Sequence, residues 1–325
     1  MNAGVVGCGL IGRKRAEGMK GNSKLVGCFD TSIETSRTFE KLFLCKRYSN
    51  VEELIQDSEI EYIVVATQHS DLIPIALRAL HAGKHVFLEK PGAVISEDLQ
   101  ELASLALKKG LKIHIGYNHR FHPSLMKLFE LIKLGGIGEL MFLRGHYGHG
   151  GRLGYEKEWR AKKRFSGGGE LIDQGSHLID ISLEILGDLN VEYAATPTLF
   201  WNMNVEDNAF LVLTNTSNNL AFLHASCTEW KNKFSLEVFG TLGKIEISGI
   251  GRSYGQEKLT YYRMLPEMGV PLKQEWIFPE EDVSWKLEIG QFVEDMKTGT
   301  NLSDNTKSSV RVLEIIEEIY RKTNR

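Results

Sequence analysis

Residues 4–12 read Gly4-Val5-Val6-Gly7-Cys8-Gly9-Leu10-Ile11-Gly12, a short apolar run that leads directly into three glycines with the spacing Gly-x-Gly-x-x-Gly. In this motif the first glycine allows a tight turn, the second lets the backbone approach a pyrophosphate, and the third lets a helix pack closely on the strand. The start of that helix offers free N–H groups and partial positive charge. Asp30 follows Gly12 by 18 residues, where a carboxylate accepts hydrogen bonds from ribose hydroxyls. The sequence therefore predicts a dinucleotide site formed by Gly7, Gly9, Leu10, Ile11, Gly12 and Asp30.

The first 120 residues alternate apolar, β-branched runs with stretches of helical periodicity. The runs predict buried strands over 4–6, 25–29, 62–66, 85–88 and 112–115. Helices are predicted over 71–82 and 96–109, between consecutive strands. Because strands separated by helices favour right-handed crossovers in a parallel sheet covered on both faces, we expect an α/β Rossmann domain, doubly wound, over residues 1–120.

The pattern changes after residue 120. Helices are predicted over 123–134 and 170–186, and from about 190 to 263 short strands follow one another with polar turns between them. Residues 308–322 carry apolar side chains at helical spacing, which predicts a helix packed on the body of the protein. We therefore expect a second, α+β domain over residues 121–325 with a large, mostly antiparallel open sheet.

The composition excludes several classes of protein. With 42% hydrophobic and 25% charged residues over 325 positions, the chain resembles soluble two-domain proteins. Its net charge of −3 argues against a nucleic-acid partner. No apolar run is long enough to span a bilayer and the N-terminus lacks a secretory pattern, so we expect no membrane partner and a cytoplasmic location.

Cysteine and histidine spacing gives no sign of a metal. The four cysteines are scattered without a Cys-x-x-Cys pair, so we interpret them as reduced thiols. The short histidine pairs have no acidic or thiol companion at ligand spacing. We therefore predict no metal site, and interpret as core and loop residues the histidines His114, His119, His122, His146 and His149.

The choice between NAD and NADP depends on the end of the second predicted strand. Asp30 would repel a 2′-phosphate, and Thr31 and Ser32 bring no guanidinium beside it. The competing signal is the basic run 13–15, which we interpret as a solvated helix face. NAD is therefore the predicted cofactor.

Two groups of residues are candidates for proton chemistry. Lys90 comes directly after the strand predicted over 85–88, at the sheet edge where open α/β sheets bind ligands. Its ammonium group can stabilise an alkoxide that develops as hydride leaves. Asp173 and His177 are four residues apart in a predicted helix, so they share one face. A surface lysine and a structural Asp–His pair are the alternatives when each group is taken alone.

These motifs together resemble the glucose–fructose oxidoreductase, inositol dehydrogenase and rhizopine-catabolism (Gfo/Idh/MocA) family over essentially the whole chain. The resemblance rests on the order and spacing of five segments. They are 7–12, 79–91 with Glu89-Lys90-Pro91, 116–121, Trp159-Arg160, and 167–177.

The resemblance implies a Rossmann domain followed by a domain whose open sheet covers the site on one face and forms a homodimer or homotetramer with the other. It implies NAD(P)-dependent chemistry on a sugar, cyclitol or nucleotide-sugar carbon, with Lys90 and His177 flanking the reacting hydroxyl and Asp173 holding the substrate. Further cofactor contacts would come from Thr67, His69, Glu89, Lys90, Asn118, Trp159 and Arg160. One departure concerns the loop after the strand 62–66, where family members often carry Pro-Asn and a later His but this chain has Gln68-His69 and Leu72.

Segment 152–164 is the best clue to the substrate. It carries a local charge of +4 in a chain that is net negative, and aromatic residues are interleaved with the cations. It fits the diphosphate and base of a nucleotide-linked sugar, or else it is a solvated loop. The predicted substrate contacts, besides the catalytic residues, are Arg120, Tyr147, Arg152 and Tyr155. Three alternatives stay open: an inositol or free-sugar dehydrogenase, an NAD-dependent glycosidase that oxidises its sugar transiently, and a non-catalytic NAD-binding sensor.

Overall fold

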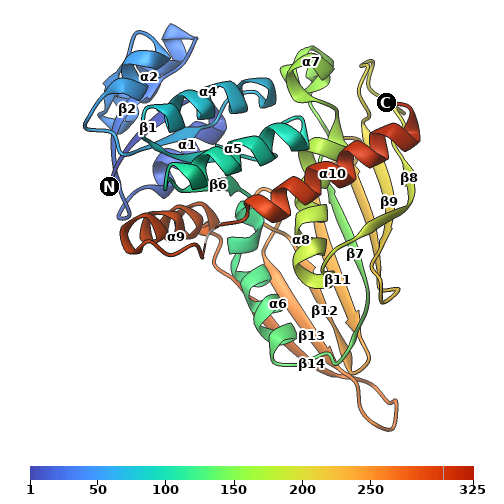
Figure 1. The fold of residues 1–325 in the computed structure, drawn as a ribbon. Coiled ribbons are helices and arrows are strands. Elements are labelled where there is room, and N and C mark those ends of the chain that lie inside the picture. Colours follow the sequence, from blue (N-terminus) through green and yellow to red (C-terminus); the bar gives the residue numbers. More distant parts are fainter. Residues whose placement is uncertain (303) are drawn as a thin grey trace. The chain divides into compact units, whose positions relative to one another are not determined.

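The computed structural model describes residues 1–302 and 304–325, which form two compact units (Figure 1). The first unit comprises Met1–Asn118 and Trp285–Leu313, and the second comprises His119–Ser284 and Glu314–Arg325. Helix α10 (Thr306–Thr323) contributes residues to both. Among the helices of the described residues, none is both long and apolar enough to cross a membrane.

The first unit contains a parallel sheet of six strands in the order β3-β2-β1-β4-β5-β6. The strands are β1 (Asn2–Val6), β2 (Lys24–Phe29), β3 (Lys46–Arg47), β4 (Tyr62–Val65), β5 (His85–Glu89) and β6 (Ile113–Gly116). The chain starts at the centre of the sheet, builds outward to β3, and then returns to β4 on the other side of β1. This strand order confirms the doubly wound prediction.

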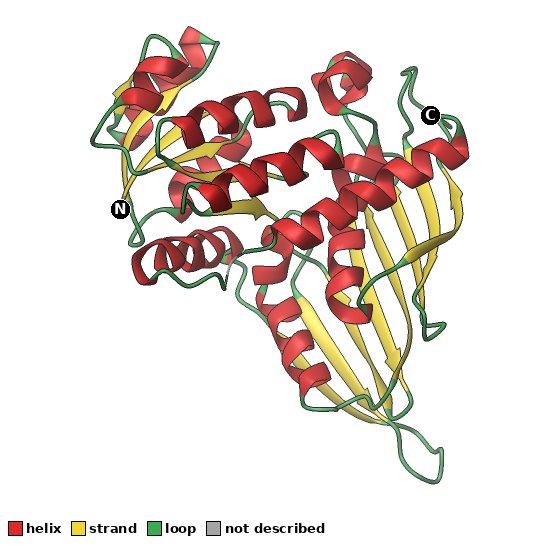
Figure 2. Cartoon of the chain, in the orientation of Figure 1, coloured by secondary structure: helices red, strands yellow, loops and turns green. Residues whose placement is uncertain are grey.

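Helices connect these strands and cover the sheet (Figure 2). They are α1 (Leu10–Gly18), α2 (Ile33–Phe43), α3 (Val51–Gln56), α4 (His69–His81) and α5 (Ser96–Lys108). Helix α9 (Ser284–Thr298) joins them from a distant part of the sequence. Its Phe292 is fully buried and packs edge-on against Tyr62 and Phe87, with ring centroids 5.9 and 5.6 Å apart. The core of this unit is therefore completed by residues that follow the second unit in the chain.

The second unit contains an eight-stranded sheet in the order β14-β13-β12-β11-β7-β10-β9-β8. The strands are β7 (Leu140–Gly148), β8 (Asn190–Ala195), β9 (Asn208–Thr214), β10 (Leu220–Ser226), β11 (Lys233–Gly240), β12 (Gly243–Ser248), β13 (Lys258–Arg263) and β14 (Leu272–Ile277). Neighbouring strands are antiparallel except β7 and β10, which are parallel. The prediction of a mostly antiparallel sheet is confirmed.

One face of this sheet packs against helices. These are α6 (Pro123–Lys133), α8 (Ser176–Leu186) and part of α10, while α7 (Lys163–Ser166) is a single turn between β7 and α8 (Figure 1). A Cβ atom added to Gly145 of β7 would lie 3.1 Å from Leu178 of α8, so helix and sheet are in close contact. On the opposite face, Tyr193 is 59% exposed and Phe222 is 50% exposed. The structure thus gives the sheet a packed face and an open face.

Candidate active site

The glycine loop after β1 has the geometry of a dinucleotide cradle. Gly7 has φ +94°, and a Cβ atom there would lie 2.3 Å from the carbonyl oxygen of Ala66. A Cβ atom on Gly12 would lie 1.9 Å from the carbonyl oxygen of Gly7. A Cβ atom on Gly9 would meet nothing within 4 Å, and Gly9 is the N-cap of α1. The first and third glycines are thus required by the fold, while the second leaves open space at a helix N-terminus, where a pyrophosphate fits.

Asp30 lies at the end of β2 beside this loop. Its carboxylate accepts hydrogen bonds of 2.8 Å from the backbone N–H groups of Cys8 and Ser32. These bonds fix the carboxylate, and each oxygen can accept a further hydrogen bond. The residues present therefore fit the adenosine ribose of a dinucleotide.

The basic run 13–15 is not a solvated helix face, and the prediction is wrong for Arg15. Its side chain is fully buried, forms ion pairs with Glu89 of β5 and Glu288 of α9, and stacks on the Phe87 ring. Sequence periodicity could not show this, because both carboxylates come from other elements. Arg15 instead ties α1, β5 and α9 together.

A histidine also belongs to this network. His114 of β6 lies 3.0 Å from a Glu288 oxygen through its Nε2 atom. Although burial alone would raise the pKa of Glu288, Arg15 and His114 lower it, so this fully buried carboxylate stays ionised. Glu89, predicted to bind the cofactor, here accepts a hydrogen bond from Arg15.

Other predicted cofactor residues lie along one edge of the first sheet. Because β1, β4 and β5 are parallel neighbours, their carboxyl ends bring together the glycine loop, the segment Thr67 to His69, and Lys90. His69 and Asn118 are buried, and the Lys90-Pro91 peptide bond is cis. Their roles at the cofactor stay predictions.

Asp173 and His177 both belong to the second unit. Asp173 lies in a π-helical turn (Leu171–Gly175) and His177 in the first turn of α8. The Nε atom of Arg160 donates a 3.0 Å hydrogen bond to Asp173. Although burial alone would lower the pKa of Arg160, Asp173 raises it, which keeps the guanidinium charged. Arg160, predicted as a cofactor residue, thus positions the Asp173 carboxylate.

Aromatic rings enclose His177, which is 5% exposed. Its imidazole stacks on His119 with ring centroids 3.9 Å apart, and Tyr147 of β7 lies edge-on at 5.9 Å. Tyr254, from the loop between β12 and β13, lies 4.9 Å from the Tyr147 ring. From the sequence, His119 is interpreted as a structural residue and Tyr254 is not a predicted site residue, since only the tertiary fold brings these rings together.

The neighbourhood of Asp173 contains acceptors suited to substrate hydroxyls. Gln174 donates through Nε2 to the Tyr254 hydroxyl at 3.4 Å. The Oε1 atom of Gln174 and the Oε2 atom of Glu170 are buried and have no hydrogen-bond partner among the described residues. Buried polar atoms without a hydrogen-bond partner are costly unless a ligand or water supplies one. A molecule rich in hydroxyl groups fits this environment.

Glu170 is a buried carboxyl group with an unusual pKa. It accepts a 2.8 Å hydrogen bond from the hydroxyl group of Tyr155, and it is 1% exposed. Burial and the nearby Asp173 charge raise its pKa to about 8. No local pattern in the chain indicates this raised pKa, because burial and the Asp173 charge act on Glu170 only in the folded protein.

We expect Glu170→Gln to stabilise the protein at alkaline pH. The pKa of Glu170 rises from 4.5 in the unfolded chain to about 8 in the folded protein. Its contribution to folding stability is therefore fully present below pH 4.5 and is lost as the pH rises through 8. The neutral amide avoids that loss. Thermal melting from pH 5 to 9 should show that the melting temperature of Glu170→Gln rises relative to the wild type as the pH increases. The exposed control Glu139→Gln should show no such relative rise. A constant difference would contradict a titrating Glu170.

Several predicted substrate residues have partners within the second unit. Arg120 forms a bidentate pair with Asp180 at 2.6 and 2.7 Å. Arg152 pairs with Glu158 at 2.6 Å, and Tyr155 is 2% exposed. Within segment 152–164 the exposed cations outside these pairs are Lys157, Lys162, Lys163 and Arg164. The substrate contacts of these residues stay predictions.

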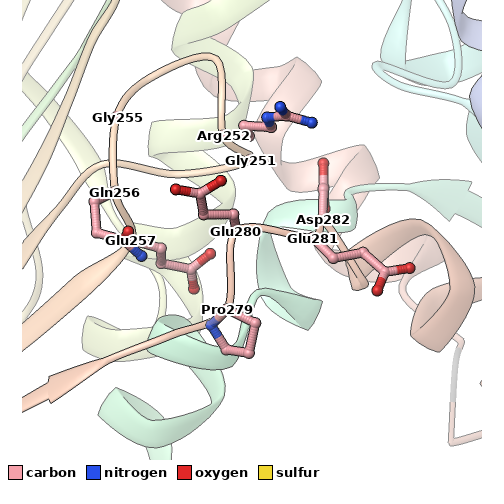
Figure 3. Close-up of a pocket in the computed structure, with 9 residues that line it drawn as sticks. All are labelled: Gly251, Arg252, Gly255, Gln256, Glu257, Pro279, Glu280, Glu281 and Asp282. Carbon is pink, nitrogen blue, oxygen red and sulfur yellow. The ribbon is translucent and has the colours of Figure 1, made fainter.

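A cavity of about 170 Å³ lies elsewhere in the second unit, between segments 251–257 and 279–282 (Figure 3). Carboxylates from both segments line it, together with Arg252. None of the predicted site residues lines it. An acidic wall does not suit a diphosphate, so this cavity does not replace segment 152–164 as the candidate for nucleotide binding.

Comparison with curated proteins and solved structures adds relatives for both units. The chain is 32% identical over 184 residues to glucose-6-phosphate 3-dehydrogenase of Bacillus subtilis, a match that covers 55% of this chain and 51% of that protein. The chain spans about half the length of the curated relatives it matches.

Two solved structures cover nearly the whole chain. Levoglucosan dehydrogenase in complex with NADH and levoglucosan has a TM-score of 0.89 at 18% identity, and covers 100% of this chain and 97% of its own. A 3-ketoreductase from Actinomadura kijaniata in complex with NADP and TDP-benzene has a TM-score of 0.85 at 18% identity, covering 99% and 97%. At this identity these structures support the fold alone.

Family models match both parts of the chain. An oxidoreductase-family model with an NAD-binding Rossmann fold matches residues 1–117. The GFO/IDH/MocA C-terminal domain matches residues 125–246. Both domains occur here in the family's order, so the chain belongs to the GFO/IDH/MocA oxidoreductase family.

Proposed function

We propose that this protein is an NAD-dependent oxidoreductase that transfers hydride between the nicotinamide and a secondary alcohol carbon of a sugar. The observation that carries the proposal is the buried His177, stacked on His119, beside an Asp173 carboxylate held by Arg160. A buried imidazole one helical turn from a carboxylate, with unsatisfied buried polar atoms nearby, suits proton transfer from a hydroxyl group. The glycine loop and Asp30 of the first unit fit the cofactor.

In the proposed reaction His177 removes the proton of the reacting hydroxyl group. Asp173 accepts a hydrogen bond from the substrate and keeps it oriented, while Lys90 stabilises negative charge on the reacting oxygen. NAD, when bound, supplies the acceptor for the hydride. With NAD bound, the alcohol would lose one proton to His177 and one hydride to the cofactor, which would give a ketone.

The preference for NAD over NADP is assigned to the charge of Asp30. We expect Asp30→Asn, which keeps an acceptor oxygen but removes the charge, to shift the affinity ratio toward NADP by about tenfold or more. A like-charge pair near a protein surface costs a few kcal/mol, and about 1.4 kcal/mol is tenfold. Calorimetric titration of both cofactors measures the ratio, with the exposed Asp71→Asn as control. An unchanged ratio would remove Asp30 from this role.

For the substrate we propose a nucleotide-linked sugar, as used in glycan or polysaccharide synthesis. The support is the exposed lysines of segment 152–164 and their proximity in sequence to the turn that carries Asp173. The 3-ketoreductase that shares the fold binds a TDP compound, which adds to this support. An inositol or free-sugar dehydrogenase is the alternative, because levoglucosan dehydrogenase shares the same fold.

Calorimetry on the cofactor-saturated protein distinguishes these substrates. We expect a panel of UDP-, GDP- and TDP-sugars to bind more tightly than free sugars and inositols. The double variant Lys162→Gln/Lys163→Gln should weaken nucleotide-sugar binding and reduce its salt dependence, while Lys108→Gln/Lys109→Gln should change neither. Exclusive binding of an uncharged sugar would favour the catabolic alternative and make segment 152–164 a solvated loop.

The two remaining alternatives predict different products. A glycosidase that uses transient oxidation would cleave a glycoside with no net NADH. A sensor would bind NAD tightly and turn over nothing in the panel.

We also propose that the open face of the second unit's sheet forms a homodimer or homotetramer. Exposed aromatic residues such as Phe222 and Tyr193 support this, since a large exposed apolar patch commonly marks an interface. Light scattering with Phe222→Glu, which should lower the molar mass to that of a monomer, tests it.

A further inference from the structure

Two histidines lie side by side on the open face of the second unit's sheet. His146 of β7 and His224 of β10 are directly paired residues on parallel neighbouring strands, and their rings are 4.7 Å apart. The residues on either side of His146 point the other way. Gly145 abuts Leu178, and Tyr147 contacts His177. The histidine pair is therefore on the face of the sheet opposite to the candidate active site.

A carboxylate completes a group of three. Glu229, in the loop after β10, has its Oε1 atom 2.9 Å from Nε2 of His146 and 4.0 Å from Nδ1 of His224. One donor atom from each residue lies within 4.8 Å of the other two. In the single chain all three side chains are about 20% exposed.

Asn208 fixes the orientation of the His224 ring. Its amide nitrogen donates to Asp207 and Thr228, each at 3.0 Å, so its oxygen is the atom that faces Nε2 of His224 at 2.9 Å. The hydrogen therefore resides on Nε2, and Nδ1 presents a lone pair on the side of Glu229. An outer hydrogen bond that selects the coordinating nitrogen is typical of histidine ligands.

The coordinating atom of His146 faces the Glu229 carboxylate. Its Nε2 is buried and makes no hydrogen bond of good geometry with any described residue, although a Glu229 oxygen is 2.9 Å away.

We propose that His146, His224 and Glu229 form a binding site for a divalent transition metal, with Zn²⁺ as the ion that best matches two imidazoles and one carboxylate. Metal–ligand distances of about 2.0–2.2 Å put tetrahedral donors roughly 3.4 Å apart, so Nδ1 of His224 must approach the Glu229 oxygen, now 4.0 Å away, while Nε2 of His146, now 2.9 Å from that oxygen, must move slightly away from it. Three protein ligands leave a fourth position for water. This site is separate from the proposed hydride transfer.

No metal site was predicted, because the histidine pairs have no acidic or thiol companion close in the sequence. The partners of His146 are instead brought to it by strand pairing and by the loop after β10. An aromatic ladder is the competing interpretation, since His224 also stacks on Phe210 at 4.2 Å. A ladder needs neither Glu229 nor the fixed Nε2–H of His224.

The test is metal binding by the full, untagged chain after chelator treatment. We expect equilibrium dialysis with Zn²⁺ to give one ion per chain with micromolar or tighter affinity, and Co²⁺ to give the visible absorption of a low-coordinate nitrogen–oxygen site. His224→Gln and Glu229→Gln should each weaken binding by about 100-fold or more, and Asn208→Ala by about 10–100-fold. Zn²⁺ should raise the melting temperature of the wild type but not of His224→Gln.

Two control variants test whether the metal binds at the proposed site. His81→Gln removes an exposed histidine of α4 and should leave binding unchanged. His177→Gln tests whether the ion binds instead at the candidate active site. Loss of binding in His177→Gln, or full binding in both His224→Gln and Glu229→Gln, would overturn the proposal. Melting curves without metal establish that the variants are folded.

Discussion

Replacing His177 with alanine is expected to lower kcat by about 10²–10⁴-fold while the Kd for NAD stays within about twofold of the wild type. The size follows from the usual contribution of a positioned general base, and the selectivity follows because His177 lies in the second unit, away from the glycine loop in the chain. Steady-state kinetics and calorimetric NAD titration on the same preparation measure both quantities.

Chemical rescue separates a catalytic His177 from a structural one. The cavity left by the ring should admit exogenous imidazole, which would restore part of the activity of His177→Ala but none of that of Asp173→Ala. If the two residues act as a unit, the double variant should be little worse than either single one. Unchanged turnover in His177→Ala, or strictly additive losses, would contradict the proposed base.

Replacing Arg15 with methionine is expected to lower the free energy of unfolding by about 3–5 kcal/mol. The change leaves Glu89 and Glu288 buried without their cation, and breaking a buried pair is much costlier than omitting it. Chemical denaturation measures the loss. The control Lys20→Met, on an exposed position just after α1, should change it by less than about 1 kcal/mol.

The stability loss of Arg15→Met should depend on pH. In the wild type the pKa of Glu288 is lowered, so its contribution to stability is present above the unfolded pKa and is lost as the pH falls. Without Arg15, protonation would relieve the buried charge, so the deficit of the variant should shrink on acidification. If the free energy of unfolding of Arg15→Met is only slightly below that of the wild type, or if the difference does not depend on pH, the two carboxylates are reached by water and the prediction is contradicted.

Local patterns were sufficient for most of the fold. Strand β4 is fully buried on both faces, and such strands appear in the sequence as continuous apolar runs. In the second unit β11 alternates buried and half-buried residues, the pattern of a sheet with one packed face. Helix α9 was not predicted, and nothing local indicates that its Phe292 and Glu288 complete the core of the first unit, since their partners are distant in sequence.

The candidate site was only partly visible for the same reason. Asp173 and His177 could be paired because they lie on one local segment. The His119 ring stacked on His177, the Tyr254 ring near Tyr147, and the pKa of Glu170 depend on tertiary contacts. The prediction for Arg15 was wrong because a charged residue in a short basic run is usually solvated. Arg15 is buried instead, because it pairs with two buried carboxylates from other elements.

The most direct test of the central claim is the stoichiometry of NADH formation with the substrate that calorimetry selects. An oxidoreductase that passes hydride from a secondary alcohol to NAD must form one NADH for each ketone produced, and the His177→Ala variant must lose both signals together. Substrate consumption without accumulating NADH would contradict the account and point to transient oxidation. Tight NAD binding with no turnover of any sugar would contradict it in favour of a sensor.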